Sequence, residues 1–316
     1  MSFLPEPTLR DIVAAYARIR SQHGAVLASP VLVEPTSQFF PDTFSGDVDS
    51  IGRLFRRIVS YAPLASDLQA SLSFVDGRGS DSEEAACGTG GCSTSTTSAK
   101  RTPRLLVASL GEHQYDVPIS TANVSNPALL VATLAHQTGS LILLEAGEVV
   151  SADEFGPTSE LAACAAGLGV VLLNGSCVYM KACSALRAHQ ATDLSPPELA
   201  LAVALFIRLH GLKAPAVRAH LEVTQREAFD EAIAWVDSNP ALVGTLRDRP
   251  ELLTDGVFQI EARKSWLSRF FGRKVANREE APVAIAVKAP VERSAEESRR
   301  LSEARALVDE ALSGST

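Results

Sequence analysis

The chain has 316 residues, of which 46% are hydrophobic and only 6% aromatic, so it can bury a sizeable and mainly aliphatic core. Its formal net charge is −8, and this acidic balance argues against nucleic-acid binding, which needs a basic surface. The sequence opens without a basic segment followed by an apolar run, so we expect no secretory signal and a cytoplasmic location.

The first part of the chain predicts two amphipathic helices followed by a strand. Apolar residues recur at helical spacing over residues 7–22 and again over residues 47–61. Polar and apolar residues then alternate over residues 69–75, which is typical of a strand with one buried face.

Residues 77–104 are rich in Gly, Ser and Thr and nearly lack large apolar side chains, so they cannot offset the entropy lost on ordering. We interpret them as a flexible insertion between two strands. Residues 105–110 and 115–119 then predict a β-hairpin, which completes a small antiparallel sheet of about three strands. Cys87 and Cys92 lie in the insertion; we expect free thiols, and a disulfide or metal clip is the alternative.

The second half of the chain predicts helices whose starts are marked by capping residues. Asn126-Pro127 predicts a helix over residues 128–144. Ser195-Pro196-Pro197-Glu198 is a capping box that predicts a helix over residues 199–210, and a second box at Thr224-Gln225-Arg226-Glu227 predicts the next helix.

Between these helices, residues 161–180 form an uncharged apolar stretch about long enough to cross a bilayer. Polar residues Asn174 and Ser176 interrupt it, as do three glycines, and no aromatic belt frames both ends. We therefore expect a buried central helix, with a transmembrane helix as the alternative.

The globular domain is expected to span residues 1–256, and residues 257–316 form a flexible tail. The tail contains a Pro/Ala linker over residues 279–292 and a terminal amphipathic helix that begins at Ser294. Its segment 262–274 is basic and aromatic, which predicts contact with a partner protein or an anionic membrane surface; an ordinary linker or packing on its own domain is the alternative. The residues expected to make this contact are Arg263, Lys264, Trp266, Leu267, Arg269, Phe270 and Phe271.

The stretch from Leu130 to Glu145 is the main candidate for chemistry. In zinc metallopeptidases a helix carries H-E-x-x-H, in which two histidines one turn apart bind zinc and the glutamate polarises the attacking water. The corresponding residues here are His136, Gln137 and Ser140. An amide cannot act as a general base, and a neutral hydroxyl is a poor zinc ligand, so we predict that this helix is not catalytic.

The motif lies within a wider pattern. Phe40-Pro41-Asp42, Leu130 to Ser140, and Gly167-Leu168-Gly169 follow one another in the order and spacing found in a family of uncharacterised bacterial zincin-like proteins. The chain resembles this family over about residues 28–240, apart from the insertion. The resemblance implies an α+β fold, in which a small antiparallel sheet packs on a mainly helical zincin-like domain.

The same resemblance implies roles for individual residues. His136 matches the first zinc-ligand histidine, and Glu160 matches an acidic residue that completes the ligand set. Gln137 replaces the catalytic base, a loss that alone costs ~10²–10⁴-fold in rate, and Ser140 replaces the second histidine. We therefore predict a catalytically inactive metallopeptidase-like domain that serves as a protein-interaction or scaffold module, with an unknown protein partner and no cofactor.

In this interpretation His136 is a polar residue at a helix–helix interface, hydrogen-bonded to Glu160 or to a backbone carbonyl. One alternative is a divergent metal-dependent hydrolase, in which His136 and Glu160 rebuild a zinc site with His113 or with a residue of the insertion. Another alternative is a peripheral membrane protein held by segment 262–274. No oligomeric state is predicted.

Overall fold

The computed structural model describes residues 3–24, 27, 30–75, 100–101, 106–182 and 185–261. The chain divides into two units, Met1–Lys264 and Ser265–Thr316, and every described residue belongs to the first unit. Several predicted features lie outside the described residues: most of the insertion at 77–104 with Cys87 and Cys92, and the tail contacts Arg263, Lys264, Trp266, Leu267, Arg269, Phe270 and Phe271.

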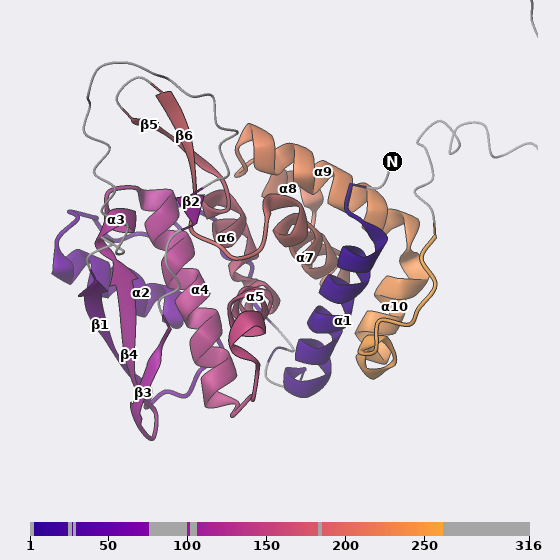
Figure 1. The fold of residues 1–316 in the computed structure, drawn as a ribbon, viewed down its shortest axis with the longest axis horizontal. Helices are drawn as coiled ribbons and strands as arrows, with labels where there is room; N and C mark the ends of the chain where they lie inside the picture. Colours follow the sequence, from indigo (N-terminus) through magenta and orange to yellow (C-terminus); the bar gives the residue numbers. More distant parts are fainter. Residues whose placement is uncertain are drawn as a thin grey trace, which may run out of the picture. The chain divides into compact units, whose positions relative to one another are not determined.

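The described unit is a mixed α+β fold and is mostly helical, as predicted (Figure 1). Helix α1 (Glu6–His23) and helix α2 (Val48–Val59) occupy the two segments where helical spacing predicts them. Asp47 caps α2, because its side chain accepts a hydrogen bond of 2.7 Å from the backbone nitrogen of Ser50.

One sheet contains β1 (Gln69–Val75), β4 (Gln114–Ser120) and β3 (Ala108–Gly111), in that order. The predicted β3–β4 hairpin is confirmed as an antiparallel pair. The prediction of an antiparallel sheet is wrong for β1, which pairs in parallel with β4. Alternating polarity identifies a strand but not the direction of its partner, and the long connection after β1 allows a parallel return.

A second sheet was not predicted. It contains β2 (Lys100–Arg101), β6 (Ala185–Gln190) and β5 (Val178–Ala182), with β2 parallel and β5 antiparallel to β6. The expected helix over residues 161–180 is therefore too long at its end, because β5 takes its last residues.

The helical part of that segment is nevertheless buried, as predicted. It consists of α5 (Ala152–Ala163), a π-helical turn η1 (Cys164–Leu168) and α6 (Gly169–Gly175). Gly167 breaks the helix with a left-handed φ of 97°, and a Cβ there would lie 2.1 Å from the carbonyl oxygen of Val31. Only glycine fits both the backbone conformation and this close approach.

Helix α4 (Pro127–Glu145) lies between the first sheet and the other helices, and it contacts α2 and β4 as well as α5 and α6 (Figure 1). Its predicted cap is confirmed, since the Asn126 side chain accepts hydrogen bonds from the backbone nitrogens of Ala128 and Leu129. At Gly139 the helix passes so close to α5 that a Cβ would lie 1.9 Å from the carbonyl oxygen of Ser159.

The remaining helices cover the far side of α5 and α6. The Ser195 capping box of α7 is confirmed, whereas the box predicted at residues 224–227 is wrong, because α9 already begins at Val223 and its preceding residue makes no side-chain cap. These helices are α7 (Pro196–Leu209), α8 (Ala214–Arg218), α9 (Val223–Ser238), α10 (Pro240–Asp248) and η2 (Pro250–Leu253). The short helix α3 (Thr121–Val124) instead precedes α4 and contacts α4 and β4.

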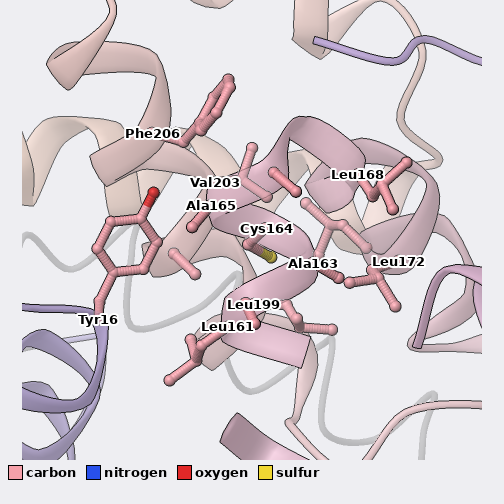
Figure 2. Close-up of a cluster of buried hydrophobic side chains, with 14 of the residues drawn as sticks. Tyr16, Leu161, Ala163, Cys164, Ala165, Leu168, Leu172, Leu199, Val203 and Phe206 are labelled. Carbon is pink, nitrogen blue, oxygen red and sulfur yellow. The ribbon is translucent and has the colours of Figure 1, made fainter. Parts of the chain in front are cut away.

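The core between α1, α5, η1 and α7 is mainly aliphatic, as the composition predicts. Figure 2 shows the Cys164 sulfur among Leu161, Leu168 and Val203, all of which are buried. Burial raises the pKa of the Cys164 thiol, so this free cysteine is a small apolar residue of the core.

The contacts of this unit run past the boundary predicted near residue 256. The Arg10 guanidinium donates hydrogen bonds to the carbonyl oxygens of Gly256 and Phe258, and it lies 5.2 Å from the centre of the Phe258 ring. The backbone nitrogen of Glu261 donates to the Asn239 side chain at 2.7 Å. The chain from Val257 to Glu261 therefore belongs to the folded unit.

Two helical stretches, Pro127–Glu145 and Ala152–Gly175, are long and apolar enough to cross a membrane by length and composition. Most of their residues are buried inside the protein, as in the core helices of many globular proteins. This burial explains their apolar composition without a membrane.

Candidate functional site

His136 on α4 faces Glu160 on α5, at the centre of the helical layer. The His136 Nδ1 atom lies 3.0 Å from the Glu160 Oε1 atom. Glu160 is fully buried, and its carboxylate also accepts hydrogen bonds from the backbone nitrogens of Asp193 and Leu194, at 2.6 and 2.8 Å. We predicted that His136 bonds to Glu160 or to a backbone carbonyl at a helix–helix interface, and the contact with Glu160 is confirmed.

Two opposing effects act on the Glu160 carboxyl group. Burial raises its pKa, because the charged form is separated from water. The hydrogen bond and charge of His136 lower the pKa, as do the hydrogen bonds from Leu194 and Asp193, but burial is the larger effect and the net shift is upward. The carboxylate therefore depends on these partners for its stability.

Asp193 is the third polar group of this cluster, and no motif in the sequence identifies it. One ligand atom from each of His136, Glu160 and Asp193 lies within 4.8 Å of the others. The Asp193 carboxylate lies against the backbone of α5, where a Cβ on Gly156 would be 1.7 Å from its Oδ2 atom. Solvent reaches the cluster from one side, since the His136 side chain is 17% exposed.

His113 does not join this cluster. Its Nδ1 atom lies 2.7 Å from the Glu145 Oε2 atom, at the C-terminal end of α4, and the Tyr115 hydroxyl donates to the other oxygen of the same carboxylate at 2.6 Å. His113 has a left-handed φ of 54° and lies in the turn between β3 and β4. Its role is therefore to join the hairpin to α4.

The two altered motif positions face neighbouring elements of the fold. Gln137 is only 2% exposed, and its Nε2 atom donates a hydrogen bond of 3.1 Å to the carbonyl oxygen of Pro118 on β4. The Ser140 hydroxyl is buried against α5, where it lies 3.1 Å from the hydroxyl oxygen of Ser159. Gln137 thus binds α4 to the sheet, and Ser140 binds α4 to α5.

The donor set of His136, Glu160 and Asp193 fits a divalent cation of the Zn²⁺ or Mn²⁺ type, which accepts one imidazole and two carboxylates. It does not fit the usual zinc peptidase mechanism, because the residue that follows His136 is an amide and cannot take a proton from water. The same three residues also form a consistent network of hydrogen bonds as they stand.

Comparison of this chain with protein-family models, with curated proteins and with solved structures finds no match.

Proposed function

We propose that this chain is a non-catalytic α+β domain that works by binding another protein, and that its His136 helix is a structural element. The observation that supports this proposal most directly is the hydrogen bond from Gln137 to Pro118. A glutamate at this position would have no proton to donate at neutral pH, and its carboxylate would face a carbonyl oxygen in a buried place. The surroundings of residue 137 therefore suit an amide and disfavour a catalytic base.

The other motif positions support the same role. His136 helps to stabilise the buried Glu160 carboxylate, which in turn holds the chain just before α7 through two backbone nitrogens. Ser140 lies at the closest approach of α4 and α5. Each of these side chains contributes to packing between elements, and none of them supplies a proton acceptor beside an open metal position.

The test is metal content combined with hydrolysis. The full chain is purified without chelator, its zinc is measured by elemental analysis, and hydrolysis of an unfolded protein substrate is followed with and without added Zn²⁺. We expect substoichiometric zinc and no hydrolysis. One equivalent of zinc together with hydrolysis, both lost in His136→Ala and both retained in His220→Ala, would contradict the proposal. His220 is a matched control because it is also a partly exposed histidine paired with a glutamate, Glu34.

A second candidate function is metal-dependent hydrolysis at His136, Glu160 and Asp193. It is favoured by the closeness of three ligand atoms, since three protein ligands are typical of catalytic zinc. A bound divalent cation would supply Lewis acidity and a more acidic bound water. In this chain His136 and Asp193 would contribute the partly exposed ligands, and the two backbone nitrogens would orient Glu160.

Calorimetric titration with Zn²⁺ and with Mn²⁺ tests this second candidate. If the site binds metal, wild type should show one binding event that Asp193→Ala removes and that Asp116→Ala retains. Asp116 lies on β4 and bonds to Ser73 in the sheet, so its loss leaves the cluster intact. The absence of a binding event in wild type would exclude the metal-dependent role and leave the binding role.

A further inference from the structure

Three adjoining hollows cross the N-terminal turn of α4, with volumes of about 300, 440 and 680 Å³. They adjoin one another, because each neighbouring pair shares lining residues. We call them together the α4 groove and define it by these shared residues. They are Phe40, Pro127 and Val131 between the first and second hollows, and Pro35, Ala128 and Asn174 between the second and third.

Apolar residues predominate in the lining of the first and second hollows, and the third is lined by apolar and polar residues together. Phe44 lines the first hollow and is 41% exposed, while Tyr179 and Val223 line the third and are 59% and 65% exposed. Large apolar side chains that stay in contact with water around adjoining depressions are typical of a binding surface. The groove therefore offers apolar area that the described part of the chain does not cover.

Two carboxylates line the groove, those of Asp42 and Glu222, and no Lys or Arg does so among the described residues. Asn174 donates from Nδ2 to the carbonyl oxygen of His220, which fixes its orientation. Glu222 is exposed on the wall of the third hollow and forms no ion pair within the described ranges. Residues 1–261 contain 29 Asp and Glu but only 18 Lys and Arg. These features complement a ligand that donates hydrogen bonds and carries positive charge.

An unpaired sheet edge borders the same groove. Strand β5 is the outer strand of its sheet, so one of its edges pairs with no described strand. Its first residues, Val178 and Tyr179, line the third hollow. The free backbone groups of an edge strand can pair with an extended peptide, and pockets beside the edge then receive alternate side chains.

We propose that the α4 groove binds an extended segment of another protein, which adds a strand to β5, places apolar side chains in the hollows and directs a lysine or arginine at Glu222. This inference rests on the proposed binding role and specifies the chemistry of the partner. Charge complementarity favours a basic segment over an acidic one. The unpaired edge of β5 favours a peptide over a compact small molecule, because backbone groups are what this edge lacks.

The probe is a phage-displayed library of random dodecapeptides, selected on the full chain. Enriched peptides are synthesised with a fluorescent label, and their affinities are measured by anisotropy. We expect enriched sequences to alternate apolar and other residues and to carry Lys or Arg. Glu222→Lys should weaken binding on the order of tenfold or more. Glu227→Lys, an exposed charge reversal within the helix that Glu222 precedes, should leave binding unchanged. Val131→Glu, which places a charge between two hollows, should also abolish binding.

Several outcomes would overturn the proposal: no enrichment from the library, enrichment of acidic peptides, or equal affinity for wild type, Glu222→Lys and Val131→Glu. Self-association of wild type that Val131→Glu removes, seen by analytical ultracentrifugation, would assign the groove to a second copy of the chain instead. Glu222 is exposed, so its variant should fold, and circular dichroism checks this. Metal-dependent hydrolysis lost in His136→Ala would contradict the non-catalytic role alone, because the groove variants leave His136 and Glu160 in place.

Discussion

The Gln137 side chain donates a hydrogen bond from Nε2 to the backbone carbonyl oxygen of Pro118, 3.1 Å away. This bond joins α4 to β4, the strand that lies in the middle of the first sheet. Because a carboxylate cannot donate a proton, the contact distinguishes glutamine from the glutamate of a peptidase motif. Glutamine at residue 137 therefore contributes to the stability of the fold, in addition to removing the catalytic base.

Restoring the catalytic glutamate should weaken the fold. Gln137→Glu removes the donor and buries a charge against a carbonyl oxygen, so we expect a loss of about 1–3 kcal/mol in the free energy of unfolding at neutral pH. The loss should shrink in acid, where a protonated carboxyl group can donate again. Urea unfolding measures it, with Gln114→Glu on the exposed face of β4 as the control. Equal stability of Gln137→Glu and wild type would contradict the structural role of the amide.

Removing Glu160 should cost more. Glu160→Ala leaves the backbone nitrogens of Asp193 and Leu194 without their acceptor and separates His136 from a buried partner. We expect a loss of about 2–6 kcal/mol, because each buried donor left without an acceptor costs about 1–3 kcal/mol. Thermal and urea unfolding would show it. In the control Asp153→Ala, which removes an exposed carboxylate from the same helix, the change should stay below about 1 kcal/mol.

Replacing Gly139 by alanine should destabilise the protein, whereas the same replacement at a helical glycine with free space around it should stabilise the protein. A Cβ at residue 139 would lie 1.9 Å from the Ser159 carbonyl oxygen, so Gly139→Ala should push α4 from α5 and cost about 1–3 kcal/mol. Gly52 in α2 has nothing within 4 Å of an added Cβ. Gly52→Ala should therefore stabilise the protein by roughly 0.5–1 kcal/mol through helix propensity. Two variants that shift stability in the same direction would argue against this packing.

The His113–Glu145 pair predicts a pH dependence. The hydrogen bond and the charge of Glu145 raise the pKa of His113 above its ordinary value of 6.5. A raised histidine pKa means that the folded state binds the proton more tightly, so the stabilisation is complete below pH 6.5 and is lost as pH rises through the folded-state value. NMR titration of the His113 ring would report that pKa directly.

Melting temperatures should show the same effect. Wild type should lose more stability than His113→Asn as pH rises from below 6.5 through the raised pKa. Asparagine is the suitable replacement because it tolerates the left-handed φ of 54° at this position and carries no charge. If the two proteins have parallel pH profiles, the ion pair does not stabilise the hairpin.

Local signals in the sequence predicted the main helices. Asn126 and Ser195 cap their helices as expected, because capping depends on residues only a few positions apart. The pairing of His136 with Glu160 was expected only from the resemblance to zincin-like proteins, because no local pattern links the two residues.

The contacts that the sequence did not predict depend on long-range placement. Asp193 reaches the cluster because the chain before α7 passes over α5, which no local pattern records. The parallel partner of β1 lies 45 residues further along the chain, as in the pair Gln69 and Gln114, and strand alternation does not reveal it. Strand β5 was assigned to the preceding helix because its apolar residues continue the same composition.

The backbone at Gly167, where the helix is interrupted, also fixes the position of the chain segment just before the α4 groove. The backbone nitrogen of Val33 donates a hydrogen bond of 3.0 Å to the Gly167 carbonyl oxygen, two residues before Pro35 begins to line the groove. Further along, the Tyr61 hydroxyl donates to the carbonyl oxygen of Phe39. This wall of the groove is thus attached to a core helix and to the end of α2, so a ligand would meet a preorganised surface and would lose little affinity to ordering it.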